Sequence, residues 1–275
     1  MNRLILEEIV RQALIEDLGT GDITSEAIFQ DNFTVKGIYV AKAAGVLAGF
    51  PAAVEVFHQL NAGVSFQLEL SDGDLVTPGT KIATISGPIK TILAGERISL
   101  NFLRHLSGIA TQTRSLVQLV AGFPVKIVDT RKTTPGLRML EKEAVRLGGG
   151  YNHRLNLADA VLIKDNHIAA CGSITEAVRR AKAYIPHTMK VEVETETEAQ
   201  VREAIACQAD IIMLDNMTPA MMQEMVKLIG RRAIVEASGN ITEVNVQAVA
   251  ATGVNIISVG SITHSVIALD ISLDL

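Results

Sequence analysis

The chain has 275 residues, 48% of them hydrophobic and 20% charged, so it can bury a large core and lacks the composition of a disordered protein. Its formal net charge of −5 argues against nucleic-acid binding, which needs an extended basic face, and its 4% of aromatic residues is too few for base stacking. Cys171 and Cys207 do not form a metal-ligand pattern. Acidic residues interrupt every apolar run in residues 1–25, so we expect neither a signal peptide nor a membrane span, and a cytoplasmic protein.

The first third of the chain predicts a small α+β unit. Residues 4–18 carry apolar side chains at helical spacing, and Gly19 follows as a helix cap. Residues 34–92 contain short alternating apolar runs, which indicate strands joined as hairpins. The expected turns lie at Asp72-Gly73, Pro78-Gly79 and Gly87-Pro88.

Residues 94–122 return to helical spacing, with a break expected at Ser107-Gly108. Beyond them, apolar strand candidates alternate with amphipathic helical segments; the strands are expected at 125–130, 160–165, 189–194, 210–216, 233–239 and 255–261. Repeated β–α units with continuously apolar strands predict a parallel sheet covered by helices. Six units without a mid-sheet reversal favour an α/β barrel over an open sheet. The tail, 268–275, alternates like one more strand.

Polar residues follow the apolar runs at all six predicted strand ends. In a parallel barrel such residues gather at one mouth, where function is usually found. The six ends carry Asp129, Thr130, Arg131 and Lys132; Lys164 and Asp165; Glu194; Asp215 and Asn216; Ser238, Gly239 and Asn240; and Val259, Gly260 and Ser261.

Four of the basic residues in 129–168, namely Arg131, Lys132, Arg154 and Lys164, indicate an anion pocket in an otherwise acidic chain. Arg131 and Arg154 can each hold a carboxylate or phosphate with two hydrogen bonds. Lys132 and Lys164 supply compact point charges. A single basic residue after a strand is usually a solvated loop charge, so the prediction rests on their concentration in one segment.

The acidic residues and the late glycine turns complete the predicted site. Glu194 and Asp215 offer hard oxygen ligands at neighbouring strand ends, which suits Mg²⁺ shared with a phosphorylated substrate. Glu192 competes with Glu194 for this role, because the run VEVE places both on one side of the strand. The turns at 238–240 and 259–261 lead into helices, where backbone N–H groups can bind phosphate.

Several residues have a simpler interpretation when taken alone. His153 is then more often a structural hydrogen-bonding residue than a catalyst. Arg97 would be an ordinary exposed helix residue, and Lys142 a surface charge.

The chain resembles the quinolinate phosphoribosyltransferase family from about residue 7 to its C-terminus. The runs that carry the resemblance, in order, are EDLGTGDITS, GERISLNFLRHLSGIAT, DTRKTTPGLR, AVRLGGGYNHR, LIKDNHI, VEVE, DIIMLDN, EASGNI and ISVGSITHS. The resemblance implies an N-terminal α+β open-sandwich domain, residues 1–105 joined by the strand 267–275, and a C-terminal α/β barrel, residues 106–266. It also implies a homodimer in which the N-terminal domain of one subunit closes the barrel of the other.

The implied reaction joins quinolinate to 5-phosphoribosyl 1-pyrophosphate with Mg²⁺ and releases nicotinate mononucleotide, pyrophosphate and CO2, a step of de novo NAD synthesis. The family motifs assign the carboxylates of quinolinate to Arg131, His153, Arg154 and Lys164, with Arg97 contributed by the partner subunit and Thr130 in the same substrate-binding set. Lys132 would lie between quinolinate and pyrophosphate, and Glu194 and Asp215 would serve the ribose and the metal. The 5-phosphate would bind at Ser238, Gly239, Asn240, Val259, Gly260 and Ser261.

Two departures from the family pattern fall in the predicted phosphate turns. The family often has glycine where Asn240 stands and alanine where Ser261 stands, so side-chain roles at these two positions are open.

Two alternatives to this enzyme remain at the level of the sequence. One is a paralogue of the same fold, of the type associated with molybdate transport, acting on another anion. The intact set of Arg97, Arg131, Arg154 and Lys164 argues against it. The other is a non-catalytic nucleotide-binding protein, which would gain nothing from the carboxylates of Glu194 and Asp215.

Overall fold

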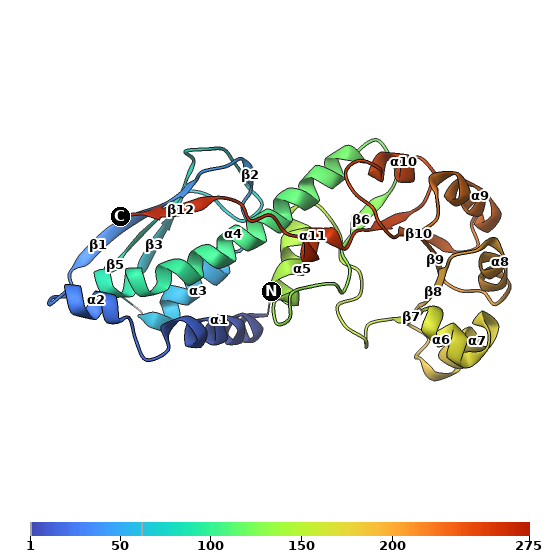
Figure 1. Ribbon diagram of the computed structural model, residues 1–275, viewed down its shortest axis with the longest axis horizontal. Helices are drawn as coiled ribbons and strands as arrows, with labels where there is room; N and C mark the ends of the chain where they lie inside the picture. The colour runs from blue at the N-terminus through green and yellow to red at the C-terminus, as the bar shows by residue number, and fades with distance from the viewer. Residues whose placement is uncertain (1, 62) are drawn as a thin grey trace. The chain divides into compact units, whose positions relative to one another are not determined.

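The computed structural model describes residues 2–61 and 63–275. These residues form two compact units: the first takes in the chain up to 114 together with 133–149 and 263–275, and the second takes in 115–132 and 150–262. Each unit has its own main sheet, antiparallel in the first and parallel in the second (Figure 1).

The first unit is built on a four-stranded antiparallel sheet in the order β12-β1-β5-β3. Its strands are β1 (Thr34–Ala41), β3 (Ser65–Leu68), β5 (Lys81–Pro88) and β12 (Ile271–Asp274), and a separate ladder joins β2 (Gly45–Val46) to β4 (Leu75–Val76). The strand predicted in the C-terminal tail is therefore confirmed, and it pairs with the first strand of the chain. The predicted turn at Gly87-Pro88 is wrong, because both residues lie inside β5.

The first unit also contains several helices and an aromatic core. The helices are α1 (Arg3–Leu18), α2 (Ile23–Ile28), α3 (Phe50–Leu60), the first part of α4 (Ile89–Leu119) and α5 (Arg138–Leu147). The predicted helix at 4–18 is confirmed, and the Asn2 side chain caps it by accepting the N–H of Leu4 at 3.0 Å. Rings of Tyr39 and Phe50 meet edge to face with their centroids 6.1 Å apart.

The expected helix break at Ser107-Gly108 is wrong, because α4 is continuous from Ile89 to Leu119. Gly108 has a different purpose: a Cβ at this position would collide with the backbone of Ile267 and Ala268. The glycine therefore allows the C-terminal segment to pass close to the helix. Lys142, expected on the surface, is also buried, with 3% of its surface exposed.

The second unit is a parallel sheet of six strands in the order β6-β11-β10-β9-β8-β7. Its strands are β6 (Lys126–Val128), β7 (Val161–Ile163), β8 (Val191–Thr195), β9 (Ile211–Asp215), β10 (Ile234–Ser238) and β11 (Ile256–Ser258). Each lies inside one of the six predicted segments to within a residue, so the parallel α/β architecture is confirmed. Among the described residues no ladder joins β6 to β7, so the barrel is open along one side.

A helix follows most of these strands and covers the sheet (Figure 1). These helices are α6 (Asp165–Cys171), α7 (Ile174–Tyr184), α8 (Glu198–Ala206), α9 (Pro219–Ile229) and α10 (Val246–Ala250), and the short α11 (Ser261–His264) follows β11. Side chains of Ser173, Thr197 and Thr218 cap the starts of α7, α8 and α9, which fixes where each of these helices begins. Of the helices in the described part of the chain, none is long and apolar enough to cross a membrane.

Candidate active site

A cavity of about 510 Å³ lies within the second unit, a volume suited to a small-molecule site. Its walls contain eleven predicted site residues, Thr130, Arg131, Lys132, His153, Arg154, Lys164, Glu194, Asp215, Ser238, Gly239 and Asn240, and also Leu162, Met213, Asn216, Glu236 and Ser258. The parallel sheet explains this convergence, because most of these residues lie at or just beyond the carboxyl ends of strands.

Asp129, the residue directly after β6, anchors the loop that carries two of the predicted ligands. The Asp129 side chain is fully buried, and its two carboxylate oxygens accept the N–H of His153 at 2.8 Å and the side-chain amide of Asn152 at 2.6 Å. Such charge-assisted hydrogen bonds are strong in a buried setting. Asp129 therefore fixes the backbone just before Arg154.

Arg131 and Arg154 bring two positive charges into the same part of the cavity. Burial lowers the pKa of Arg154, the nearby charge of Arg131 lowers it further, and the carboxylates of Glu192 and Asp159 oppose the change. The Arg154 guanidinium also donates to the carbonyl oxygen of Ala160 at 3.2 Å. Two partly buried guanidinium groups that repel each other form a site prepared for an anion with more than one negative charge.

Lys164 and Glu194 form an ion pair across neighbouring strands, with 2.6 Å between the Lys164 Nζ and the Glu194 Oε2. Lys164 follows β7 and Glu194 lies near the end of β8. The side chain of Glu194 is 12% exposed and that of Lys164 is 46% exposed. The pair places a positive and a negative charge next to each other in the cavity wall.

A short chain of hydrogen bonds links the end of β9 to the turn after β10. The Asn216 side chain donates to Asp215 at 2.6 Å and accepts from the Asn240 side chain at 3.0 Å, while its backbone N–H donates to the carbonyl of Ser238. Asn216 and Asn240 have φ of 54° and 51°, a left-handed conformation that asparagine tolerates better than most residues. Gly239 has φ of 92°, and a Cβ there would overlap the Asn216 side chain.

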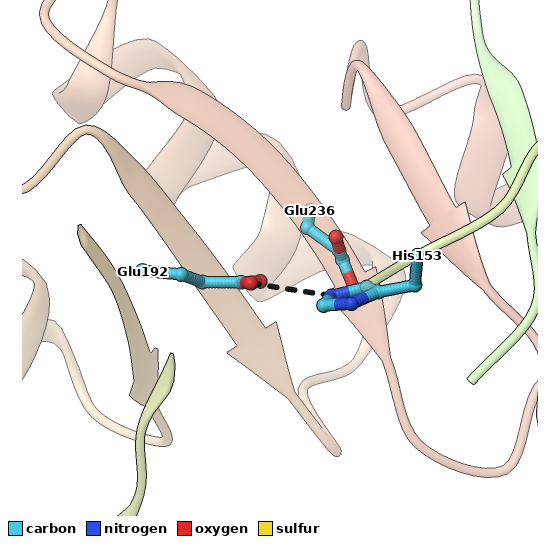
Figure 2. A group of neighbouring side chains, drawn as sticks. All are labelled: His153, Glu192 and Glu236. Atoms are coloured by element: carbon cyan, nitrogen blue, oxygen red, sulfur yellow. Dashed lines mark ion pairs between the residues drawn. The ribbon is translucent and has the colours of Figure 1, made fainter. Parts of the chain in front are cut away.

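The inner cluster consists of His153, Glu192 and Glu236. Figure 2 shows the two glutamates pointing toward the His153 ring, Glu192 from β8 and Glu236 from β10. The His153 Nε2 lies 3.2 Å from a Glu192 oxygen and 3.6 Å from a Glu236 oxygen. Burial, followed by the charge of Glu192, raises the pKa of Glu236 to about 7. Glu236 is thus largely a neutral acid below neutral pH.

Four predicted site residues lie outside the cavity wall. Val259 is buried and its N–H donates to the carbonyl of Val128 in the neighbouring strand, while Gly260 and Ser261 follow it at the start of α11. Arg97 lies exposed on α4, in the part of that helix that belongs to the first unit. Its predicted contact from a partner subunit stays a prediction.

Sequence reasoning passed over Glu236 and treated Glu192 only as a rival of Glu194. The signal was present: Glu192 and Glu194 alternate with valines in β8, and Glu236 stands two residues before Ser238, so it shares a face with a predicted ligand. Isolated strand glutamates do not indicate which other strands they meet. That information came from the sheet order, in which β9 separates β8 from β10.

Two carboxylates in the cavity wall are suited to a hard cation. Glu194 and Asp215 lie near the ends of adjacent strands and line the same cavity as four cationic side chains. Oxygen ligands of this kind, one or two from the protein and the rest from water and substrate phosphate, are what Mg²⁺ normally takes. The donor set therefore fits the predicted Mg²⁺.

Comparisons with known proteins match the whole length of the fold. Residues 22–107 match the N-terminal domain and residues 109–274 the C-terminal domain of quinolinate phosphoribosyl transferase. A probable nicotinate-nucleotide pyrophosphorylase (carboxylating) of Bacillus subtilis is 50% identical over 100% of this chain and 94% of its own length. A protein of the same name from Synechocystis is 48% identical over 93% of this chain and 87% of its own. The solved structure of the nicotinate-nucleotide pyrophosphorylase from Francisella tularensis superposes with a TM-score of 0.95 at 39% identity, covering 100% of this chain and 97% of that one.

Proposed function

The chain belongs to the quinolinate phosphoribosyl transferase family, and we propose that it joins quinolinate to 5-phosphoribosyl 1-pyrophosphate with loss of CO2. The products are nicotinate mononucleotide, pyrophosphate and CO2, so the enzyme is a pentosyltransferase of de novo NAD synthesis. The observation that carries this function is one cavity that gathers Arg131, Lys132, Arg154 and Lys164 with the carboxylates of Glu194 and Asp215. Cationic side chains alone would bind any anion. The added carboxylates suit a reaction in which positive charge develops on the substrate.

The guanidinium groups of Arg131 and Arg154 bind the two carboxylates of quinolinate, with Lys164 beside them. Bidentate hydrogen bonds fix a planar diacid in one orientation, which presents its ring nitrogen for attack. Nicotinate lacks the 2-carboxylate and leaves part of this charge without a partner. Quinolinate is therefore the better substrate.

Lys132 faces the pyrophosphate that leaves. As the ribose C1–O bond breaks, negative charge grows on the pyrophosphate and positive charge grows on the sugar. Lys132 stabilises the first, and the carboxylates of Glu194 and Asp215 stabilise the second. Glu194 and Asp215 would hold Mg²⁺, which would supply charge neutralisation for phosphate oxygens. Lys164, whose ammonium neutralises Glu194 in the structure, is released to the diacid when Glu194 turns to another cation.

The decarboxylation follows from the charge of the new nucleotide. Once the ring nitrogen carries the ribose it is cationic, and the bond between ring C2 and its carboxylate breaks with the electron pair left on C2. The neighbouring positive nitrogen stabilises that pair until C2 takes up a proton. This second step needs orientation and charge, and no organic cofactor.

The turn Ser238, Gly239 and Asn240 supplies the site for the 5-phosphate. The left-handed backbone of Gly239 and Asn240 directs the chain around the cavity wall, and N–H groups of such turns bind phosphate. Thr130 lies in the same wall, where its hydroxyl accepts the N–H of Lys132 at 3.0 Å. Val259, Gly260 and Ser261 would contribute from the next strand end, as the family motif implies.

We assign the active enzyme to a homodimer, with Arg97 reaching the diacid from the partner subunit, and to the cytoplasm. The exposed position of Arg97 on α4 supports a contact made between subunits. The test uses Arg97→Ala and Lys132→Ala, each expected to be inactive alone. Each mixed dimer of the two variants contains one intact site. The hybrids should therefore recover about a quarter to a half of the wild-type activity. Hybrids that stay inactive would rule out a contribution in trans.

One assay tests the function itself. The protein is incubated with quinolinate, phosphoribosyl pyrophosphate and Mg²⁺, and release of CO2 is measured with formation of nicotinate mononucleotide. Turnover is expected with quinolinate and little with nicotinate, and EDTA should abolish it. A well-folded protein that releases no CO2 under these conditions would disprove the proposed function. The relatives reported above are named for the carboxylating reaction, which favours it over a paralogue acting on another anion.

A further inference from the structure

The inner cluster of His153, Glu192 and Glu236 lies at the cavity, yet the proposed reaction gives no task to either glutamate. Both are nearly fully buried, with 4% of Glu192 and 1% of Glu236 exposed. Burying two carboxyl groups is costly unless they are paired or hydrogen bonded. Two buried carboxyl groups in the wall of an active site therefore indicate a specific role.

The hydrogen bonds of His153 determine which ring nitrogen carries the proton. The backbone N–H of Arg154 donates to Nδ1 at 2.8 Å, so Nδ1 must be an unprotonated acceptor. The neutral ring then carries its proton on Nε2, which points at Glu192 with 3.2 Å between the nitrogen and the carboxyl oxygen. The ring is held on both sides as one tautomer.

Glu236 supports this arrangement from the third side. One oxygen of each glutamate is buried without a hydrogen-bond donor among the described residues, and a proton on the Glu236 carboxyl would relieve this. The raised pKa of Glu236, to about 7, agrees with such a proton. The Glu236 carboxyl also has Ser258 on β11 as a hydrogen-bonding neighbour.

A metal ion is the obvious rival occupant, because ligand atoms of the three side chains all lie within 4.8 Å of one another. The tautomer argues against it. A histidine ligand needs a free lone pair on the coordinating nitrogen, and here the proton on Nε2 occupies the position that would face the metal.

We propose that Glu192 and Glu236 are positioning residues that hold His153 as a neutral Nε2–H donor and thereby fix Arg154 for the diacid. Neither glutamate touches the substrate in this role. The Nδ1 of His153 holds the backbone N–H of Arg154, and Asp129 holds the N–H of His153, so two successive N–H groups are fixed. The Arg154 guanidinium that binds quinolinate is then attached to a rigid backbone. This inference deepens the proposed function and rests on it.

The state of His153 is measured directly by ¹⁵N NMR of histidine-labelled protein, without any variant and without substrate. The expected spectrum shows His153 with a protonated Nε2 and a bare Nδ1 from pH 6 to pH 8. A ring protonated on Nδ1, or one that becomes an imidazolium near its usual pKa of about 6.5, would overturn the proposal. Because this readout needs no turnover, it stays informative even if the enzyme assay fails.

Kinetics of two variants at one position test the link to Arg154. Glu192→Leu keeps the size but removes the acceptor, and the KM for quinolinate should rise about tenfold or more, while the KM for phosphoribosyl pyrophosphate changes little. Glu192→Gln keeps an acceptor oxygen for Nε2–H and should recover most of the loss. Glu243→Gln, a substitution of an exposed glutamate, is the control and should leave both KM values unchanged.

The outcomes separate positioning from simple stability. If Glu192→Leu raises both KM values equally, or lowers only the amount of folded protein, the proposal is wrong. If Glu192→Gln is as impaired as Glu192→Leu, the hydrogen bond to His153 is not what matters. Should wild-type protein lack turnover while the NMR result holds, the proposed function fails and the tautomer assignment stands.

Discussion

Strand β8 carries two glutamates two residues apart, and they have opposite environments. Glu194 belongs to the outer charges, a set made up of Lys132, Lys164, Glu194 and Asp215, and its carboxylate is paired with the Lys164 ammonium. Glu192 belongs to the inner cluster, where its neighbours are the ring of His153 and the acid of Glu236. Two glutamates on the same face of one strand therefore have different partners. Glu194 pairs with a cation, and Glu192 accepts a hydrogen bond from His153.

The two glutamates differ because their carboxyl groups have different neighbouring charges and different exposure to solvent. Lys164 is half exposed, and its ammonium lies 2.6 Å from the Glu194 carboxylate, so the outer pair is open to solvent. In the inner cluster, burial and the neighbouring charge of Glu192 disfavour a negative charge on Glu236. Outer acids can thus act on the reaction, while inner acids hold other residues in place.

The comparison is tested most severely by Glu194→Gln. The amide keeps the shape but cannot stabilise positive charge on the ribose, so we expect kcat to fall by about 10²-fold or more. Glu192→Gln, two residues away, should cost less than about tenfold. Both are measured as CO2 release at saturating substrates, with Glu196→Gln as an exposed control beyond the end of β8. Equal losses at 192 and 194 would mean that the division into outer and inner acids is false.

A smaller effect is expected on stability, through the pKa of Glu236. Because the folded protein raises that pKa from 4.5 to about 7, it favours the neutral acid, and this contribution is complete below pH 4.5. It is lost as the pH rises from there through about 7, so the wild-type fold weakens over that range by roughly 3 kcal/mol. Glu236→Gln removes the titration.

Thermal unfolding of wild type and Glu236→Gln at pH 5 and pH 8 measures this difference. The melting temperature of wild type should fall relative to that of the variant by several degrees between the two pH values. A difference in melting temperature between the two proteins that is the same at both pH values would show that Glu236 keeps an ordinary pKa. Glu236 would then belong with the ionised acids.

Much of the second unit could be predicted from its sequence, because each strand is a continuous apolar run with a polar residue at its end. That pattern located all six parallel strands and many of the residues that line the cavity. The first unit was harder to predict. Its strands pair across long loops, and glycines such as Gly87 and Gly108 permit close packing where the sequence indicated turns or breaks.

The inner cluster could not be predicted for a different reason. His153, Glu192 and Glu236 come from a loop and two strands that are not neighbours in the sheet. Their roles depend on a tautomer and a buried proton, which are set by distances of about 3 Å that spacing in a sequence does not encode. Sequence pattern identifies the residues that face a cavity, and only three-dimensional contacts show which of them face each other.

The smallest effect is expected at Asn240, where the family often has glycine. Glycine adopts the φ of 51° without strain, which offsets the loss of the hydrogen bond from the Asn240 side chain to Asn216. Asn240→Gly should therefore change the KM for phosphoribosyl pyrophosphate by about threefold or less. The matched change Gly239→Ala adds a Cβ against Asn216 at a φ of 92°, and should raise that KM about tenfold or more because Asn216 also holds Asp215. If Asn240→Gly proves as harmful as Gly239→Ala, the Asn240 side chain binds the phosphate itself, and the turn acts through more than its backbone.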